Sequence, residues 1–119
     1  ETNTFTIIGY IKDKQQIIDK ANILYFESVD KKCYAYTQQQ VYQIHTTLVE
    51  LEENMKGIEF IRVNKSTIIN LYKVRSIKAD INMRTIINFV NNEKAVVTRH
   101  YSKAFKSSLY KLRNQLNNE

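Results

Sequence analysis

The chain has at its centre the run Phe60-Ile61-Arg62-Val63-Asn64-Lys65-Ser66-Thr67-Ile68-Ile69-Asn70. Its β-branched and aromatic residues favour extended strands at residues 59–63 and 67–69. The polar residues Asn64, Lys65 and Ser66 stand between the two strands and suit a tight turn. The run therefore predicts a β-hairpin whose turn carries an amide, a cation and a hydroxyl.

Further strand patterns lie on both sides of this hairpin. Runs rich in β-formers occupy residues 5–11, 16–18, 23–27, 33–37 and 41–45 before it and residues 74–78, 85–90 and 95–98 after it. Asp13-Lys14 is expected to turn the first of these strands back onto the second. The pattern predicts a mainly β fold with no repeat and no internal linker.

Two helices complete the predicted fold. Thr47 and Glu50 form a capping box for a short helix at residues 47–55, which Gly57 is expected to end. A second, basic helix at residues 102–116 is predicted from the spacing of Phe105, Leu109, Leu112 and Leu116. The two helices are far apart in the chain, so no helix-turn-helix motif is expected.

Length and rare residues narrow the class of protein. A chain of 119 residues predicts one domain, residues 1–119, and its start at Glu1 rather than Met suggests excision from a longer protein. No apolar run approaches the ~18 residues of a membrane span, so we expect no membrane-spanning segment and a cytoplasmic location. Two glycines, one cysteine (Cys33) and two histidines leave no Gly-rich phosphate loop, disulfide framework or zinc site. We expect no enzyme, no cofactor and no metal.

The net charge of +6 is unevenly distributed along the chain. Residues 1–61 contain six Lys/Arg and nine Asp/Glu, whereas residues 62–119 contain twelve Lys/Arg and three Asp/Glu. A basic half of this kind favours a polyanionic partner, either nucleic acid or an anionic membrane surface. A solvated basic face without a partner is the alternative.

Three segments are candidates for contacting such a partner. Their residues are Lys31, Lys32, Arg62, Asn64, Lys65, Ser66, Arg99, His100 and Lys103. Asparagine suits the N6/N7 edge of adenine, lysine and arginine suit guanine or a phosphate, and serine suits a phosphate. Each segment also has an alternative without a partner. Lys31 and Lys32 would then only add solubility, and residues 62–66 would form an ordinary solvated turn. In the last segment Ser102 would cap the helix while Arg99 pairs with an acidic neighbour.

The central run resembles the signature of the LytTR family of bacterial DNA-binding domains, in which Phe-x-Arg-Val-His-Arg-Ser and an aromatic residue precede Ile/Leu-Val-Asn. Residues 23–27 are similar to the family's early Ile-x-Tyr-Ile-Glu strand, and residues 97–101 are similar to its Val-Ser-Arg-x-Tyr element. The ordered resemblance covers residues 5–113. Asn64, Lys65 and Thr67 depart from the family's usual His, Arg and aromatic residue, which puts the preferred DNA sequence in doubt.

The resemblance implies an elongated stack of antiparallel sheets with a flanking helix. It also implies that the loops around Lys31-Lys32, Asn64-Lys65-Ser66 and Arg99 enter successive major grooves of promoter DNA at direct repeats. An N-terminal receiver or other signalling domain would precede the chain, as in a response regulator of a two-component system. The alternatives are a β-rich protein-interaction or effector-sensing module with a basic face, and a single-strand binder that stacks bases on exposed tyrosines.

Overall fold

The computed structural model describes residues 6–55, 57, 59–80, 82 and 84–117. The predicted central hairpin is present as β6 (Phe60–Asn64) and β7 (Thr67–Asn70), which pair antiparallel. All four residues of β7 are buried. Ile68 belongs to one apolar cluster and Ile69, on the opposite face, to a second cluster. The hairpin therefore lies between the two cores of the molecule.

A seven-stranded sheet contains this hairpin at one edge. Its other strands are β1 (Ile7–Ile11), β2 (Lys14–Ile18), β3 (Ile23–Val29), β4 (Lys32–Thr37) and β5 (Val41–Ile44). The order is β2-β1-β5-β4-β3-β7-β6, and every pair is antiparallel. A short 3-10 helix, η1 (Lys20–Asn22), precedes β3. The β1–β2 turn falls on Lys12 and Asp13, one residue earlier than predicted, because Lys14 already pairs with Ile11.

A second, three-stranded antiparallel sheet follows the hairpin in the chain. It has the order β10-β9-β8 and consists of β8 (Val74–Ala79), β9 (Thr85–Phe89) and β10 (Lys94–Val97). The 3-10 helix η2 (Leu71–Lys73) leads into it from β7. Ile87, Phe89 and Val97 from this sheet join Val63 and Ile69 in one buried cluster. The second sheet therefore packs on the hairpin through this shared apolar cluster.

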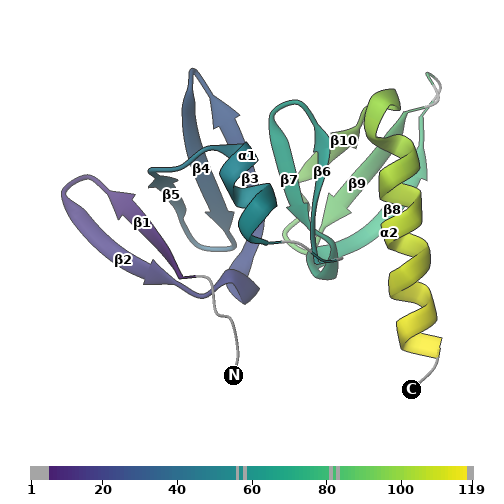
Figure 1. Cartoon of the computed structure of the whole chain (residues 1–119), viewed down its shortest axis with the longest axis horizontal. Helices are drawn as coiled ribbons and strands as arrows, with labels where there is room; N and C mark the ends of the chain where they lie inside the picture. Colours follow the sequence, from purple (N-terminus) through teal and green to yellow (C-terminus); the bar gives the residue numbers. More distant parts are fainter. Residues whose placement is uncertain (1–5, 56, 58, 81, 83, 118–119) are drawn as a thin grey trace.

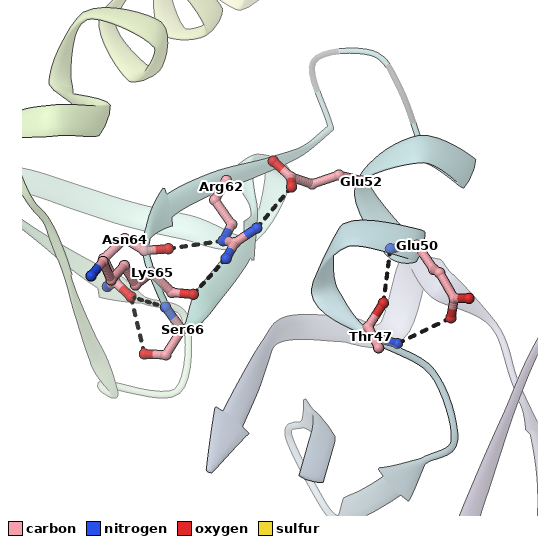
Figure 2. Close-up of polar contacts among 7 residues, drawn as sticks. All are labelled: Thr47, Glu50, Glu52, Arg62, Asn64, Lys65 and Ser66. Atoms are coloured by element: carbon pink, nitrogen blue, oxygen red, sulfur yellow. Dashed lines mark hydrogen bonds and ion pairs between the residues drawn. The ribbon is translucent and has the colours of Figure 1, made fainter. Parts of the chain in front are cut away.

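The short helix α1 (Leu48–Asn54) covers the first core. The predicted capping box is confirmed: the Glu50 N–H donates to Thr47 Oγ1 at 3.2 Å and the Thr47 N–H donates to Glu50 Oε1 at 3.3 Å (Figure 2). Leu48 and Leu51 are buried against the seven-stranded sheet. The prediction that Gly57 caps the C-terminus is wrong, because the helix ends at Asn54 with Met55 as its cap.

The long helix α2 (Arg99–Asn117) packs beside β6 and β10. Phe105 anchors it in the second core, with Tyr101, Leu109 and Leu112 partly buried along the same face. The helix begins three residues before the predicted start at residue 102, so Ser102 lies inside it and is not its cap. The Tyr101 N–H donates to the Thr98 carbonyl at 3.0 Å, which starts the helix directly after β10.

The molecule is flat, with extents of 42 × 38 × 25 Å. In Figure 1 three connections lie along its upper edge: the β3–β4 turn (Asp30 and Lys31), the β6–β7 turn (Lys65 and Ser66) and the start of α2 at Arg99. We call these three connections the loop edge. The start of β1 and the end of α2 both lie at the opposite edge (Figure 1). Side chains on the loop edge are therefore presented away from the points where the described chain begins and ends.

Candidate nucleic-acid interface

The β6–β7 turn is held by the side chain of Asn64. Its Oδ1 accepts hydrogen bonds from the Ser66 N–H at 2.9 Å and from Ser66 Oγ at 3.1 Å (Figure 2). Its Nδ2 donates to the main-chain carbonyl of Val96 in β10 at 2.8 Å. Both ends of the Asn64 amide are thus used within the protein, and Lys65 is left at the tip of the turn.

Arg62 is also engaged inside the protein. Its Nε donates to the Asn64 carbonyl at 3.0 Å and its Nη2 donates to the Lys65 carbonyl at 2.5 Å. Its Nη1 forms an ion pair of 2.7 Å with Glu52 of α1 (Figure 2). The guanidinium therefore stabilises the β6–β7 turn through its main-chain carbonyls.

The start of α2 lies against this turn. The Thr98 N–H donates to the Val63 carbonyl at 3.0 Å, which joins the end of β10 to β6. A hollow of about 720 Å³ results between the two segments, and its lining comprises Asn64, Lys65, Ser66, Thr98, His100 and Tyr101. The His100 and Tyr101 rings meet edge to face, with centroids 4.9 Å apart. Two of the three predicted contact segments, residues 62–66 and residues 99–103, are thus brought together.

Arg99, His100 and Lys103 extend the basic surface along the first turns of α2. All three side chains are exposed. None of them forms a hydrogen bond or an ion pair with a described residue. Because α2 starts at Arg99, its first N–H groups also point toward the loop edge. An anion at this end of the helix would be stabilised by both the side-chain charges and the helix dipole.

The β3–β4 turn is the third component of the loop edge. Asp30 and Lys31 form a two-residue turn in which both have positive φ, at 52° and 68°, as a type I′ hairpin requires. Lys31 and Lys32 are exposed. The Ser28 N–H donates to the Ser66 carbonyl at 2.8 Å, so this hairpin is attached directly to the β6–β7 turn.

Residues 13–110 match the sequence model of the LytTr DNA-binding domain. The chain belongs to the LytTR family of DNA-binding domains. The predicted membership, made from three short motifs, is thereby confirmed over most of the chain.

Similar proteins agree with this membership. The LytTR domain is 28% identical over 104 residues to an uncharacterized HTH-type transcriptional regulator of Staphylococcus aureus strain NCTC 8325 / PS 47, an alignment that covers 87% of this chain and 70% of that protein. The corresponding protein of strain MRSA252 is 27% identical over the same length. A LytTr DNA-binding domain from Bacillus cereus has the same fold, with a TM-score of 0.85 at 22% identity over 90% of this chain and 98% of that one.

Two contacts of the LytTR domain's interface could not be recognised in its sequence. Glu52 lies in α1, and no local sequence pattern links it to Arg62, yet the two side chains form an ion pair. Val96 contributes a main-chain carbonyl, a group that every residue has, so no sequence signal marks it. Their contacts depend on how α1 and β10 pack against the hairpin.

Other chemistry is limited in the described part of the LytTR domain. No group of three metal-ligating side chains is found among the described residues. Cys33 is buried, and this burial raises the pKa of its thiol to about 11, as expected for a packing residue rather than a reactive thiolate. No helix in the described ranges is long and apolar enough to cross a membrane.

Proposed function

We propose that this domain binds double-stranded promoter DNA sequence-specifically as part of a bacterial transcription regulator, with the three connections of the loop edge entering successive major grooves. The observation that supports this most strongly is the junction of the β6–β7 turn with the start of α2. Lys65 and Arg99 are exposed cations there. The segments that carry them are joined by two hydrogen bonds, one from the Asn64 side chain to the Val96 carbonyl and one from the Thr98 N–H to the Val63 carbonyl. Rigidly spaced donors of this kind are what direct readout of base edges needs.

The proposed roles follow from which side chains are available. Lys65, Arg99 and His100 are exposed and have no described intramolecular partner, so we assign base contacts to them. Lys31, Lys32 and Lys103 are assigned to phosphate contacts, which position the protein without specifying sequence. Ser66 is assigned to shaping the turn, because its hydroxyl already donates its hydrogen to Asn64 Oδ1. Asn64 and Arg62, which the sequence analysis included among DNA contacts, are assigned to shaping the turn because their polar atoms are already bonded within the protein.

The loop edge also suits a larger regulator. The start of β1 lies at the opposite edge of the domain (Figure 1), so a preceding receiver or other signalling domain could be attached there without obstructing DNA. We propose that this domain, residues 1–119, is the output domain of such a response regulator, and that two copies occupy direct repeats in promoters.

The test is selection of bound duplexes from a random library, followed by titration of selected and scrambled duplexes at several salt concentrations. We expect the domain to bind the selected duplex at least about a thousandfold more tightly than a scrambled duplex at physiological salt. Its affinity should fall steeply as the salt concentration rises. Two copies of one motif at a fixed spacing in the selected pool would support the direct repeats.

Other outcomes of the same experiment would refute the proposal. Weak binding with no enriched sequence would favour a protein-interaction or effector-sensing module with a basic face. Competition by oligo-dT would favour single-strand binding, because bases stacked on tyrosines need no duplex.

A further inference from the structure

The β6–β7 turn has an irregular backbone that needs support. Arg62 pairs with Ile68 and Asn64 pairs with Thr67, so the register of the hairpin shifts at Val63 between them. Such a bulge leaves main-chain groups without a partner in the strand ladder. The two carbonyls just beyond it, those of Asn64 and Lys65, both accept hydrogen bonds from Arg62. The Arg62 guanidinium thus holds the main chain that follows the bulge.

Arg62 is poorly placed to contact DNA itself. Its side chain is only 17% exposed, and all three of its nitrogens already donate to protein oxygens. A planar guanidinium can make three such bonds at fixed angles, which a lysine ammonium at the end of a flexible chain cannot reproduce. The position of Lys65 at the tip of the turn therefore depends on the orientation of the Arg62 guanidinium.

That orientation is set from another element. Glu52 of α1 accepts a hydrogen bond from Arg62 Nη1 at 2.7 Å (Figure 2). The Glu52 side chain is 43% exposed. Neighbouring Glu53 is exposed on the same helix and has no ion pair with a described residue. A carboxylate near a DNA-binding surface ordinarily weakens binding by repelling phosphates. Glu52 would nevertheless favour DNA binding through its contact with Arg62, whereas Glu53 has no such contact among the described residues.

We infer that Glu52 and Arg62 are positioning residues for sequence-specific DNA binding: Glu52 orients Arg62, and Arg62 holds the Asn64 and Lys65 carbonyls so that Lys65 meets its base. This inference rests on the proposed function. Its sharpest consequence is that removing the negative charge of Glu52 weakens binding to the selected duplex, although the protein becomes more positive.

The experiment compares Glu52→Gln, Arg62→Lys and Arg62→Ala with the matched control Glu53→Gln. Affinity for the selected and for scrambled duplex is measured by fluorescence anisotropy at several salt concentrations. Arg62→Ala and Arg62→Lys should lose about tenfold to hundredfold in affinity for the selected duplex, and Glu52→Gln about threefold to tenfold. Affinity for scrambled duplex should be largely kept in the two Arg62 variants and kept or slightly increased in Glu52→Gln, with an unchanged salt slope in all three. Glu53→Gln should bind both duplexes as tightly as the wild type or slightly more tightly.

Two results would overturn the inference. If Arg62→Ala weakens both duplexes equally and lowers the salt slope by about 1, Arg62 holds a phosphate directly. If Glu52→Gln behaves like Glu53→Gln, the ion pair does not position the turn.

A measurement on the free protein separates this inference from the proposed function. The backbone amide resonances of Lys65 and Ser66 should shift in Glu52→Gln and remain unchanged in Glu53→Gln. If the wild type prefers no duplex sequence, the proposed function fails, while unshifted amides in Glu52→Gln would by themselves refute the positioning role.

Discussion

Asn64 at the end of β6 and Val96 in β10 are joined by a hydrogen bond of 2.8 Å from the side-chain Nδ2 to the main-chain carbonyl, although they lie 32 positions apart in the sequence. Among the described residues, it is one of three hydrogen bonds that connect the parts of the loop edge. The others are the main-chain bonds from Thr98 to Val63 and from Ser28 to Ser66, at 3.0 and 2.8 Å. The three segments therefore form one connected surface rather than independent loops.

Replacement of Asn64 by alanine should weaken both the fold and specific DNA binding. The Val96 carbonyl and the Ser66 N–H would lose their partner in a partly buried place, and a loss of this kind costs about 1–3 kcal/mol. We expect the free energy of unfolding in urea to fall by about that amount. Asn88→Ala is the control, because Asn88 makes a single, longer bond of 3.3 Å to Ser76 on an exposed face. Equal destabilisation by the two substitutions would contradict the role of Asn64.

Arg99→Ala should reduce affinity for the selected duplex by about 1–3 kcal/mol and relax the preference at one base position. The reason is that its guanidinium is exposed at the start of α2 and bonds to no described residue. Repeated selection with the variant measures the relaxed position directly. Arg113→Ala removes the same charge from the far end of α2 and should leave the preference intact. An unchanged preference in Arg99→Ala would exclude a base contact.

Lys32→Ala should weaken binding to selected and scrambled duplexes about equally and lower the salt slope by about 1, as expected for the loss of a phosphate contact. Titrations at 50–300 mM salt, roughly the range in which such slopes are measured, provide the test. Lys14→Ala is the control, because Lys14 lies in β2 at the far edge of the seven-stranded sheet. A loss limited to the selected duplex would instead assign Lys32 to a base.

Lys31→Gly should stabilise the protein while weakening its binding to DNA. Lys31 has a φ of 68°, a conformation that glycine adopts without the steric cost that a side chain brings. The Asp-Gly pair is also a favoured type I′ turn, so we expect a gain of about 0.5–1 kcal/mol in the free energy of unfolding. The lost cation should reduce DNA affinity. Destabilisation on urea unfolding would show that Lys31 makes a structural contact.

High pH should destabilise the fold through two tyrosines between the sheets. Tyr25 stacks on Tyr36 and on Phe89, with ring centroids 4.4 and 5.1 Å apart. Burial, and then the nearby Glu93 carboxylate, raises the pKa of Tyr25 above its ordinary value. Burial, together with the hydrogen bond that Tyr36 donates to Glu27 at 2.9 Å, raises the pKa of Tyr36 to about 12.

The direction of this pH dependence follows from the number of protons that the folded and unfolded states bind. A tyrosine with a raised pKa in the fold keeps its proton there when the unfolded chain has lost it, so its stabilising contribution is complete below about pH 10 and is lost as pH rises toward 12. Urea unfolding at pH 9, 10 and 11 should show little change in the free energy of unfolding from pH 9 to 10 and a clear decline from pH 10 to 11. Tyr36→Phe should decline less steeply than the wild type, and an equal decline would refute the contribution of Tyr36.

Local sequence patterns were sufficient for the elements themselves. The β-forming residues and polar turn of the β6–β7 hairpin, the Thr47–Glu50 capping box and the spacing of Phe105 and Leu109 depend on residues within a few positions of one another, and the structure contains all three features. The errors lie at element ends: at Lys14, at Gly57 and at the start of α2. Ends are set by hydrogen bonds to other elements as well as by local preference.

By itself the sequence determined the mainly β class and the three basic segments, because residue type and local periodicity carry that information, and it indicated the family through the resemblance of three short motifs. Only the tertiary structure decided which polar groups of those segments are free. Asn64 and Arg62 look like DNA-contacting residues in sequence, yet packing of β10 and α1 against the hairpin brings Val96 and Glu52 within bonding distance of them. Because a side chain that is bonded within the protein is no longer available to a base, these long-range contacts leave Lys65, Arg99 and His100 exposed on the loop edge.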